Sequence, residues 1–433
     1  MADLPARRTL LQAGVCALLP LALPASTAPA PANPPSPSGQ NAAAAAAGTD
    51  STGSAGAADG NGGNGGNGGA GGASGDAPAS PGAQVSSWNA WEVFKKQFMS
   101  EGGRILSGAE GTGQTYSEAQ AYALFFALVA NDRPAFETLL TWTENNLCEG
   151  DMTAHLPAWL WGKRADGTWG VVDSNPASDA DVWIAYALGE AGRLWNERRY
   201  RALSTLLAAR ILREETAELP GLGRSLLPAP KGFTPGDNRW RLNPSYMPLQ
   251  VMQWLARTQP QPEWRALADS SRDIILGASP QGFSPDWTLY DVQQGFLQDT
   301  EGAEKGQGGY NAIRVYLWAG MMHPDAPDRQ RLLDALAPMA RFVRRHGYPP
   351  ESIDILSGQH SGAAPSGFSA ALLPFLKAAK EDTALQEQRL RIDARPIQAQ
   401  AYYEQVLSLF GLGWDENSYQ FTATGQLRLR WQR

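Results

Sequence analysis

The sequence predicts a large all-α domain of stacked helical hairpins behind an N-terminal segment without ordered structure. Apolar residues recur at helical spacing through most of the chain, strand signals are scarce, and the only long tract without large apolar side chains ends at residue 83. The chain has 433 residues, so 350 follow that tract, more than the about 250–300 that usually share one core. No second Pro-, Gly- and Ser-rich linker interrupts them, which favours one closed body over two domains.

Composition excludes several classes of protein. The 36 Lys and Arg against 43 Asp and Glu give a net charge of −7, so nucleic acid is not an expected partner. Two cysteines, Cys16 and Cys148, and four histidines leave too few ligands for a disulfide framework or a Cys/His zinc site. The 15 tryptophans suggest that something flat and apolar is bound.

Residues 1–30 have the pattern of an export signal. Arg7 and Arg8 precede an apolar stretch that ends at Leu23, and small residues follow. The Arg-Arg-x-Leu-Leu run resembles a twin-arginine motif, and the ordinary secretion route stays open. The stretch is short and interrupted by prolines, so we expect no membrane span in the mature protein and a periplasmic or secreted location.

Residues 31–83 are expected to form a disordered linker. They contain no aromatic residue, no Leu, Ile, Val or Met, and no Lys or Arg. Such a tract buries too little apolar surface to offset its conformational entropy. Its Pro-rich beginning should be stiffer than its Gly- and Asn-rich end.

The remaining residues, 84–433, form the predicted helical domain. Helical periodicity is visible over 88–99, 117–130, 134–147, 179–195, 199–212, 246–256, 264–276, 310–322, 328–345, 369–379 and 399–410. Candidate start signals are Ser117 before Glu118, Asn131-Asp132 before Pro134, and Ser178-Asp179 before the next apolar face. About a dozen helices indicate stacked hairpins, in a closed α/α toroid or an open solenoid. No repeat period is visible, which favours the toroid, with functional residues at helix starts and in loops.

Two helix starts carry carboxylates that chemistry can use. Glu118 opens an otherwise apolar helix, where it is either a partner of the helix N-terminus or a general acid in apolar surroundings. Asp179 and Asp181 lie one residue apart at another helix start. They are interpreted as cap and dipole partner, as metal ligands, or as one carboxylate that faces a substrate cleft.

These segments resemble family 8 of the glycoside hydrolases, and within it the secreted endoglucanases encoded beside bacterial cellulose synthases. The resemblance is carried by residues 116–132, 156–163, 177–195, 243–246 and 313–321. It extends from Trp88 to the C-terminus and therefore covers nearly all of the predicted folded part.

The resemblance implies an (α/α)6 barrel with an open groove for a β-1,4-glucan, which is cut with inversion at the anomeric carbon. By motif, Glu118 is expected to be the general acid. Asp179 is expected at the central sugar, where it stabilises positive charge; older schemes label this position the nucleophile. This chemistry requires no cofactor and no metal.

One position departs from the family pattern. Relatives have Tyr-Asp-Ala-Ile-Arg with the Asp as general base, whereas this chain has Asn311 there. An amide positions a water but cannot accept its proton. The preceding loop offers Glu301 and Glu304, which are either a substitute base or ordinary solvated charges, and Glu301 is taken as the substitute.

Aromatic and basic residues complete the expected groove. Trp159, Trp161 and Tyr246 come from segments expected beside it, where rings stack on glucosyl faces. Arg314 lies one turn after Asn311 and is expected to orient a carboxylate.

The sequence leads to three hypotheses about function. The first is an exported endo-β-1,4-glucanase acting on cellulose, with the cellulose synthase export machinery as a further partner. The second is a glucan-binding protein that lacks the general base and does not cut. The third is a family 8 hydrolase that cleaves another β-1,4-polysaccharide, such as chitosan.

Overall fold

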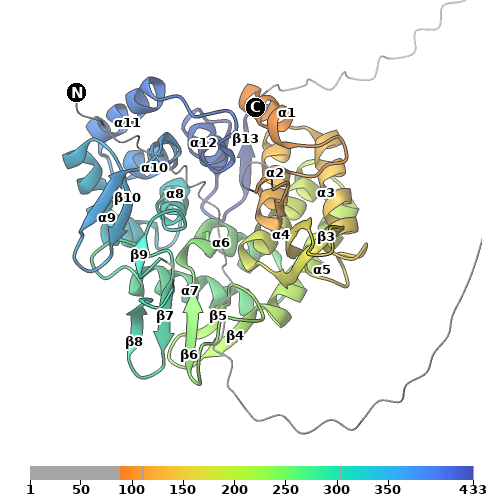
Figure 1. Ribbon diagram of the computed structural model, residues 1–433, viewed down its shortest axis with the longest axis horizontal. Coiled ribbons are helices and arrows are strands. Elements are labelled where there is room, and N and C mark those ends of the chain that lie inside the picture. Colours follow the sequence, from red (N-terminus) through yellow and green to blue (C-terminus); the bar gives the residue numbers. More distant parts are fainter. Residues whose placement is uncertain (1–87, 109–111, 303, 433) are drawn as a thin grey trace, which may run out of the picture. The chain divides into compact units, whose positions relative to one another are not determined.

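Twelve α-helices and thirteen short strands make up the described part of the computed structural model, which is residues 88–108, 112–302 and 304–432 (Figure 1). The expected export signal (1–30) and linker (31–83) lie outside the described residues. None of the described helices is both long and apolar enough to cross a membrane.

The helices follow the predicted ranges closely. They are α1 (Asn89–Phe98), α2 (Ser117–Val129), α3 (Arg133–Leu147), α4 (Ser178–Leu194), α5 (Arg198–Glu214), α6 (Leu249–Thr258), α7 (Glu263–Gly277), α8 (Ile313–Met321), α9 (Arg329–His346), α10 (Ser366–Ala378), α11 (Asp382–Ala394) and α12 (Tyr402–Asp415). Of these helices, α11 is the one that the sequence does not predict, because it buries only Ala384, Leu385 and Gln388 and therefore shows little periodicity.

The helices form an (α/α)6 barrel, as predicted. The even-numbered helices make an inner ring in which each contacts the next, and the odd-numbered helices pack outside them (Figure 1). The ring closes where Phe410 of α12 packs against Phe125 and Phe126 of α2, with ring centroids 5.5 and 4.7 Å apart. One closed core therefore serves the whole domain, which is why its length needs no second domain.

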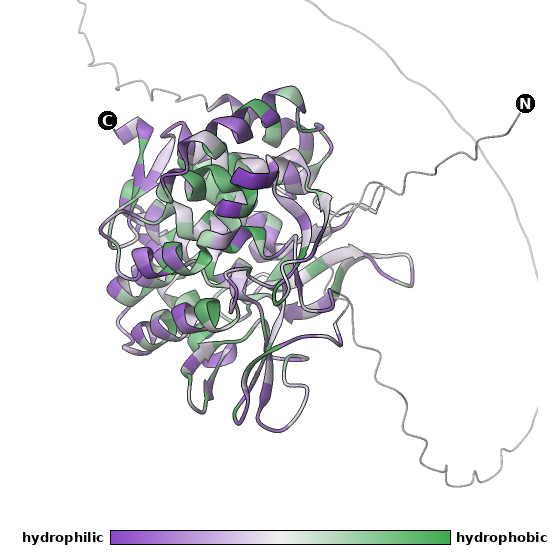
Figure 2. Ribbon diagram, turned by 90° about the vertical axis from the view of Figure 1, so that its left-hand side faces the viewer, coloured by the Kyte–Doolittle hydropathy of each residue, from purple (hydrophilic) through white to green (hydrophobic). Residues whose placement is uncertain are grey.

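The distribution of apolar residues along each helix determines whether it lies in the inner or the outer ring. Every residue of α8 is buried, and in α2 only Glu118 is partly exposed, because these inner helices are apolar on all sides. The outer helix α9 buries one face, which includes Leu332, Leu336 and Val343, and leaves its arginines outside. In Figure 2 hydrophobic residues accordingly gather in the interior and hydrophilic ones at the periphery.

Short antiparallel strands decorate the connections between helices. They are β1 (Thr115–Tyr116), β2 (Ala158–Lys163), β3 (Trp169–Pro176), β4 (Thr216–Leu219), β5 (Gly223–Leu226), β6 (Arg239–Leu242), β7 (Thr288–Asp291), β8 (Gly295–Gln298), β9 (Gln307–Gly308), β10 (Pro350–Asp354), β11 (His360–Ala363), β12 (Tyr419–Phe421) and β13 (Leu427–Leu429). They pair as β1-β2-β3, β4-β5, β6-β7-β8, β11-β10-β9 and β12-β13. Runs this short give little alternation in the sequence, which explains why strand signals were scarce.

The predicted starts of α2, α3 and α4 are confirmed to within one residue, but only one of the three start signals caps its helix. Asp132 caps α3, since its side chain accepts the Ala135 N–H at 3.1 Å. Ser117 and Ser178 are instead the first helical residues of α2 and α4, after Tyr116 and Ala177. A hydroxyl one position inside the helix is not placed to cap it, and neither serine Oγ has a hydrogen-bond partner among the described residues.

Candidate active site

The first turns of three inner helices meet at one end of the barrel. Glu118 lies in the first turn of α2, Asp179 in the first turn of α4, and Arg314 in the first turn of α8. Outer helices carry the chain back between successive inner helices, so the inner N-termini gather at the same end. Residues far apart in the sequence thereby form one polar cluster.

The centre of the cluster is the Arg314 guanidinium, which is 1% exposed. Its Nη1 donates to Glu118 Oε1 at 2.5 Å, to the Tyr122 hydroxyl at 2.9 Å and to Asp179 Oδ2 at 3.4 Å. Its Nη2 donates to Ser245 Oγ at 3.1 Å and to Asn311 Oδ1 at 2.8 Å. Arg314 therefore binds both predicted carboxylates and also Asn311, which stands where the family pattern has the general base.

Asp179 is almost fully enclosed. Its side chain is 2% exposed, and Oδ1 accepts the Ala180 N–H at 2.8 Å. Burial and the neighbouring charge of Glu118 raise the pKa of Asp179 to about 7, against the opposing effect of Arg314. A carboxyl with this pKa changes its charge near neutral pH.

The spacing of the two carboxylates restricts their roles. Because Arg314 Nη1 lies 2.5 Å from Glu118 Oε1 and 3.4 Å from Asp179 Oδ2, these two oxygens are at most 5.9 Å apart. Inverting glycosidases keep their acid and base about 6.5–9.5 Å apart to make room for a water, and retaining ones about 5–5.5 Å. Asp179 is therefore too close to Glu118 to act as the base that activates water in an inverting mechanism.

Asp181, the other acid of this helix start, points elsewhere. It is fully buried close to Glu215, which is buried too, and no side-chain oxygen of either carboxyl has a hydrogen-bond partner among the described residues. Burial raises the pKa of both carboxyls, and the charge of Asp181 raises that of Glu215 further. Of the alternatives left open for this pair, the structure places Asp179 at the Arg314 cluster and Asp181 in the interior.

Asn311 lies at the turn that leads into α8, and it is 8% exposed. The turn is anchored by Asp286, which sequence reasoning missed. Asp286 Oδ1 accepts the backbone N–H groups of Gly309, Asn311 and Ala312 at 2.9, 2.8 and 2.7 Å. Burial raises the pKa of Asp286 to about 6 although these three bonds oppose the rise. The donors lie 23–26 residues away from Asp286 in the sequence, so no local sequence pattern predicts these hydrogen bonds.

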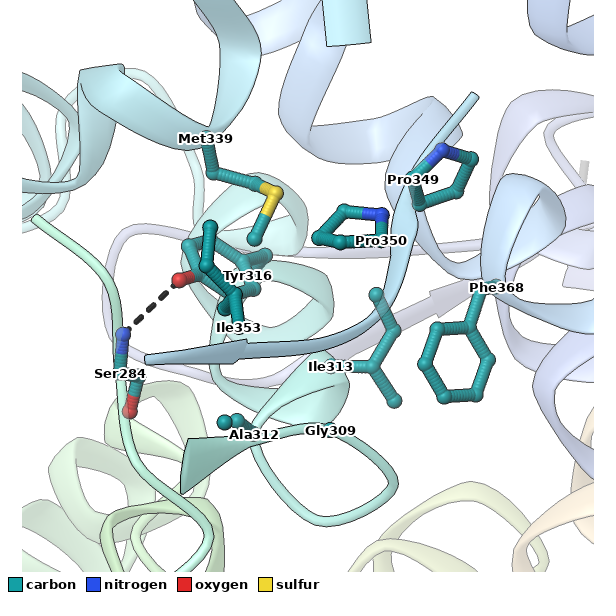
Figure 3. Close-up of a pocket in the computed structure, with 11 residues that line it drawn as sticks. Ser284, Gly309, Ala312, Ile313, Tyr316, Met339, Pro349, Pro350, Ile353 and Phe368 are labelled. Carbon is teal, nitrogen blue, oxygen red and sulfur yellow. Dashed lines mark hydrogen bonds between the residues drawn. The ribbon is translucent and has the colours of Figure 1, made fainter. Parts of the chain in front are cut away.

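Apolar packing supports the same turn from behind. Ile313 and Tyr316 of α8 meet Ile353 and Phe368 around a cavity of about 10 Å³ (Figure 3). The Tyr316 hydroxyl accepts the Ser284 N–H at 2.9 Å, which fixes the loop that carries Asp286. The polar groups at the start of α8 therefore rest on a well-packed base.

The two loop acids differ in their surroundings. Glu301, the predicted substitute base, is exposed and forms no ion pair with any described residue. Glu304 is held by Arg241, whose Nη2 lies 3.2 Å from Glu304 Oε2 and whose guanidinium lies 4.0 Å from the centre of the Trp287 ring. The charge of Glu304 also contributes to the raised pKa of Asp286, after burial. Glu304 is therefore the loop acid positioned toward the Asn311 turn.

The predicted aromatic residues lie in different settings. Trp159 is partly buried and stacks on Tyr116, with centroids 5.7 Å apart and planes at 13°. Trp161 meets Trp142 edge-on at 5.6 Å. Tyr246 is 5% exposed, so little of its ring is open for stacking on a sugar.

A more exposed ring completes this aromatic surface. Trp169, which the sequence analysis passed over, stacks on Trp161 at 5.4 Å and is 49% exposed. The Arg104 guanidinium lies 4.7 Å from the centre of Trp161 and 5.5 Å from that of Trp169. Trp161 and Trp169 face each other only because β2 and β3 pair, with Trp161 opposite Val171.

Comparison with known proteins identifies the family. Residues 80–417 match the sequence profile of the family described as Glycosyl hydrolases family 8. This chain belongs to glycosyl hydrolase family 8. The resemblance found in the sequence is thereby confirmed, and with it the expectation that the chain is a glycosidase.

Relatives and solved structures of family 8 agree with this assignment. A Salmonella typhi protein named Endoglucanase is 48% identical over 344 residues, which are 79% of this chain and 91% of that protein. An Escherichia coli K12 Endoglucanase is 45% identical over the same shares. The crystal structure of an endo-1,4-D-glucanase from Vibrio fischeri ES114 superposes with a TM-score of 0.74 at 43% identity, covering 80% of this chain and all of that chain.

Proposed function

We propose that this family 8 glycosidase is an endo-β-1,4-glucanase that hydrolyses cellulose with inversion at the anomeric carbon. The observation that carries the proposal is the cluster in which buried Arg314 binds both Glu118 and Asp179 at the N-terminal end of the inner helices. The names of the relatives, endoglucanase and endo-1,4-D-glucanase, support the choice of substrate.

In this mechanism Glu118 protonates the oxygen that leaves the anomeric carbon. Glu118 suits the role because its side chain is 16% exposed, whereas Arg314 and Asp179 behind it are nearly sealed. Asp179 binds the central sugar and, once ionised, stabilises the positive charge that develops on the ring.

Glu304 is our candidate for the group that activates water. Asn311 cannot accept a proton, and Asp286 Oδ1 is occupied by three backbone N–H groups. Glu304 keeps 25% of its side chain exposed and is held by Arg241. Glu301, which the sequence analysis preferred, lacks such a support.

A second candidate function rests on Asn311 itself. Its amide oxygen accepts from Arg314 Nη2 at 2.8 Å, so an amide is accommodated where relatives place a base. A protein of this kind would bind glucan without cutting it.

We further propose that the enzyme is exported and acts on glucan made by a cellulose synthase. Arg7, Arg8 and the apolar stretch after them support export. Fusion of residues 1–83 to a reporter that is active only outside the cytoplasm tests the route, and a change of both arginines to Lys should abolish export if the twin-arginine pathway is used.

Release of reducing ends from carboxymethylcellulose tests the activity. The proposal expects a rapid fall in viscosity with few new ends, as random internal cuts produce. A protein that binds the polymer but releases no ends would support the second candidate. Faster release from chitosan than from carboxymethylcellulose would move the substrate to another β-1,4-polysaccharide.

A further inference from the structure

A second pocket, outside the Arg314 cluster, is lined by basic and aromatic side chains. It has a volume of about 410 Å³ and lies between α9 and the turn from β10 to β11. Its principal residues are Phe283, Arg341, Phe342, Arg345, His346 and His360, which we call the basic pocket. Pockets that bind small molecules have volumes of this order.

The charge of the basic pocket is uncompensated. Among the described residues that line it, none is acidic. Arg341 and Arg345 are one helical turn apart, and neither forms an ion pair with any described residue. By contrast, Arg344 of the same helix pairs with Glu381 at 3.1 Å. Like charges at this spacing destabilise a helix, so the stability of α9 does not explain why Arg341 and Arg345 lie side by side.

The rings of two histidines line the same pocket. The ring of His346 stacks on Phe342 at 4.2 Å and meets the ring of His360 at 5.0 Å. Burial, His360 and Arg345 lower the pKa of His346, as expected where cations crowd together. An anion placed among these groups would relieve that repulsion.

Favourable interaction with the helix dipole accounts for only part of the arrangement. Arg345 and His346 lie in the last turn of α9, where cations are stabilising. Arg341 lies a turn earlier, and His360 comes from β11. Helix α9 and strand β11 therefore both contribute basic residues to the basic pocket. The helix dipole does not account for the contribution of β11.

We propose that the basic pocket binds a phosphate group carried on a body about the size of one sugar ring. Guanidinium groups recognise phosphate through paired, charge-assisted hydrogen bonds. The rings of Phe283 and Phe342 offer an apolar wall to the attached body. A free phosphorylated sugar and a phosphate-bearing lipid headgroup present the same chemistry, and two arms of the experiment separate them.

Calorimetric titration of the full-length protein with glucose 6-phosphate tests the proposal, with glucose as the uncharged match. We expect saturable binding of glucose 6-phosphate and none of glucose at this pocket. The variant R341Q/R345Q should weaken the binding at least about 10-fold, since it removes two charge-assisted contacts. The variant R265Q/R331Q is the control, because it removes two exposed arginines without ion pairs from α7 and α9.

Sedimentation with phosphatidylglycerol vesicles, against phosphatidylcholine vesicles, forms the second arm. Binding to the former that R341Q/R345Q abolishes assigns the pocket to lipid headgroups, and binding of the sugar phosphate alone assigns it to free phosphates. Absence of both, or equal binding by R341Q/R345Q and the native protein, overturns the proposal. Hydrolysis of carboxymethylcellulose should be unchanged in R341Q/R345Q, which keeps this test separate from the proposed activity.

Discussion

Arg314 carries one positive charge and faces two carboxylates, so the buried cluster is negative whenever both are ionised. Burial raises the pKa of Asp179 to about 7, with a further rise from the charge of Glu118 and an opposing effect from Arg314.

Glu118→Gln should lower kcat on carboxymethylcellulose by about 10²–10⁴-fold, because the leaving oxygen loses its proton donor. Folding should be kept, since a Gln oxygen still accepts from Arg314 Nη1. Glu263→Gln is the matched control, as Glu263 is an exposed acid in the first turn of α7. Near-normal turnover by Glu118→Gln would remove Glu118 from the mechanism.

Asp179→Asn should change how stability depends on pH. The pKa of Asp179 is raised from 3.8 to about 7 in the folded protein, so its contribution to stability is full below pH 4 and is lost as pH rises through 7. Asn does not titrate. Relative to the native protein, the variant should therefore gain up to about 4 kcal/mol in free energy of unfolding between pH 4 and pH 7.

Urea unfolding at pH 4, 5.5 and 7 measures this difference. Other buried acids, such as Asp286, titrate in both proteins and cancel. A difference that stays constant over this range would show that Asp179 is ionised throughout.

Glu304→Gln should reduce kcat at least about 10²-fold if Glu304 activates the water. Glu301→Gln, three residues earlier in the same loop, should leave kcat unchanged. Asn311→Asp in the Glu304→Gln background should restore part of the activity, because it places a carboxylate at the relatives' base position. The opposite pattern, with Glu301→Gln inactive and Glu304→Gln normal, would favour the acid chosen from the sequence.

At the scale of elements, the structure shows what sequence pattern conveys and what it does not. Helices α2 and α8 can be predicted from the sequence because they are apolar runs. Their first turns contain the predicted site residues Glu118 and Arg314. The polar helix α11 and the two-residue strands β1 and β9 have no such pattern.

Contacts between distant segments were equally hidden. Asp286 accepts hydrogen bonds from the turn before α8, and Glu304 pairs with Arg241, which is 63 residues away. Both contacts depend on how the barrel closes. The family motif led to Glu118 and Asp179 because they stand at fixed places in helix starts. The loop before Asn311 has no fixed pattern, so sequence alone could not choose between its acids.

The turn between β9 and α8 should depend on its anchor. Asp286→Ala leaves three backbone N–H groups, two of them buried, without their acceptor. It should cost about 2–4 kcal/mol of stability, with a loss of kcat because Asn311 and Arg314 shift. Asp286→Asn keeps one acceptor oxygen and should lose less. The control is Asp291→Ala, whose carboxylate accepts two N–H groups in the exposed turn after β7 and also pairs with Arg239 at 3.1 Å. Equal effects of the two alanine variants in urea unfolding would contradict the anchor.

At the scale of the whole molecule, ring closure decides where the chemistry occurs. Contact of α12 with α2 through Phe410 completes the inner ring, and completion brings the first turns of α2, α4 and α8 to one place. An open solenoid would spread the same residues along a surface. The site is therefore a property of the closed barrel and not of any single motif.

The anomeric form of the first product tests the central claim most directly. Proton NMR of cellohexaose hydrolysis, recorded before mutarotation, should show the α-anomer, because an inverting enzyme delivers water to the face opposite the leaving group. The β-anomer as first product would contradict the account. It would mean that Asp179, whose Oδ2 is at most 5.9 Å from Glu118 Oε1, attacks the sugar itself.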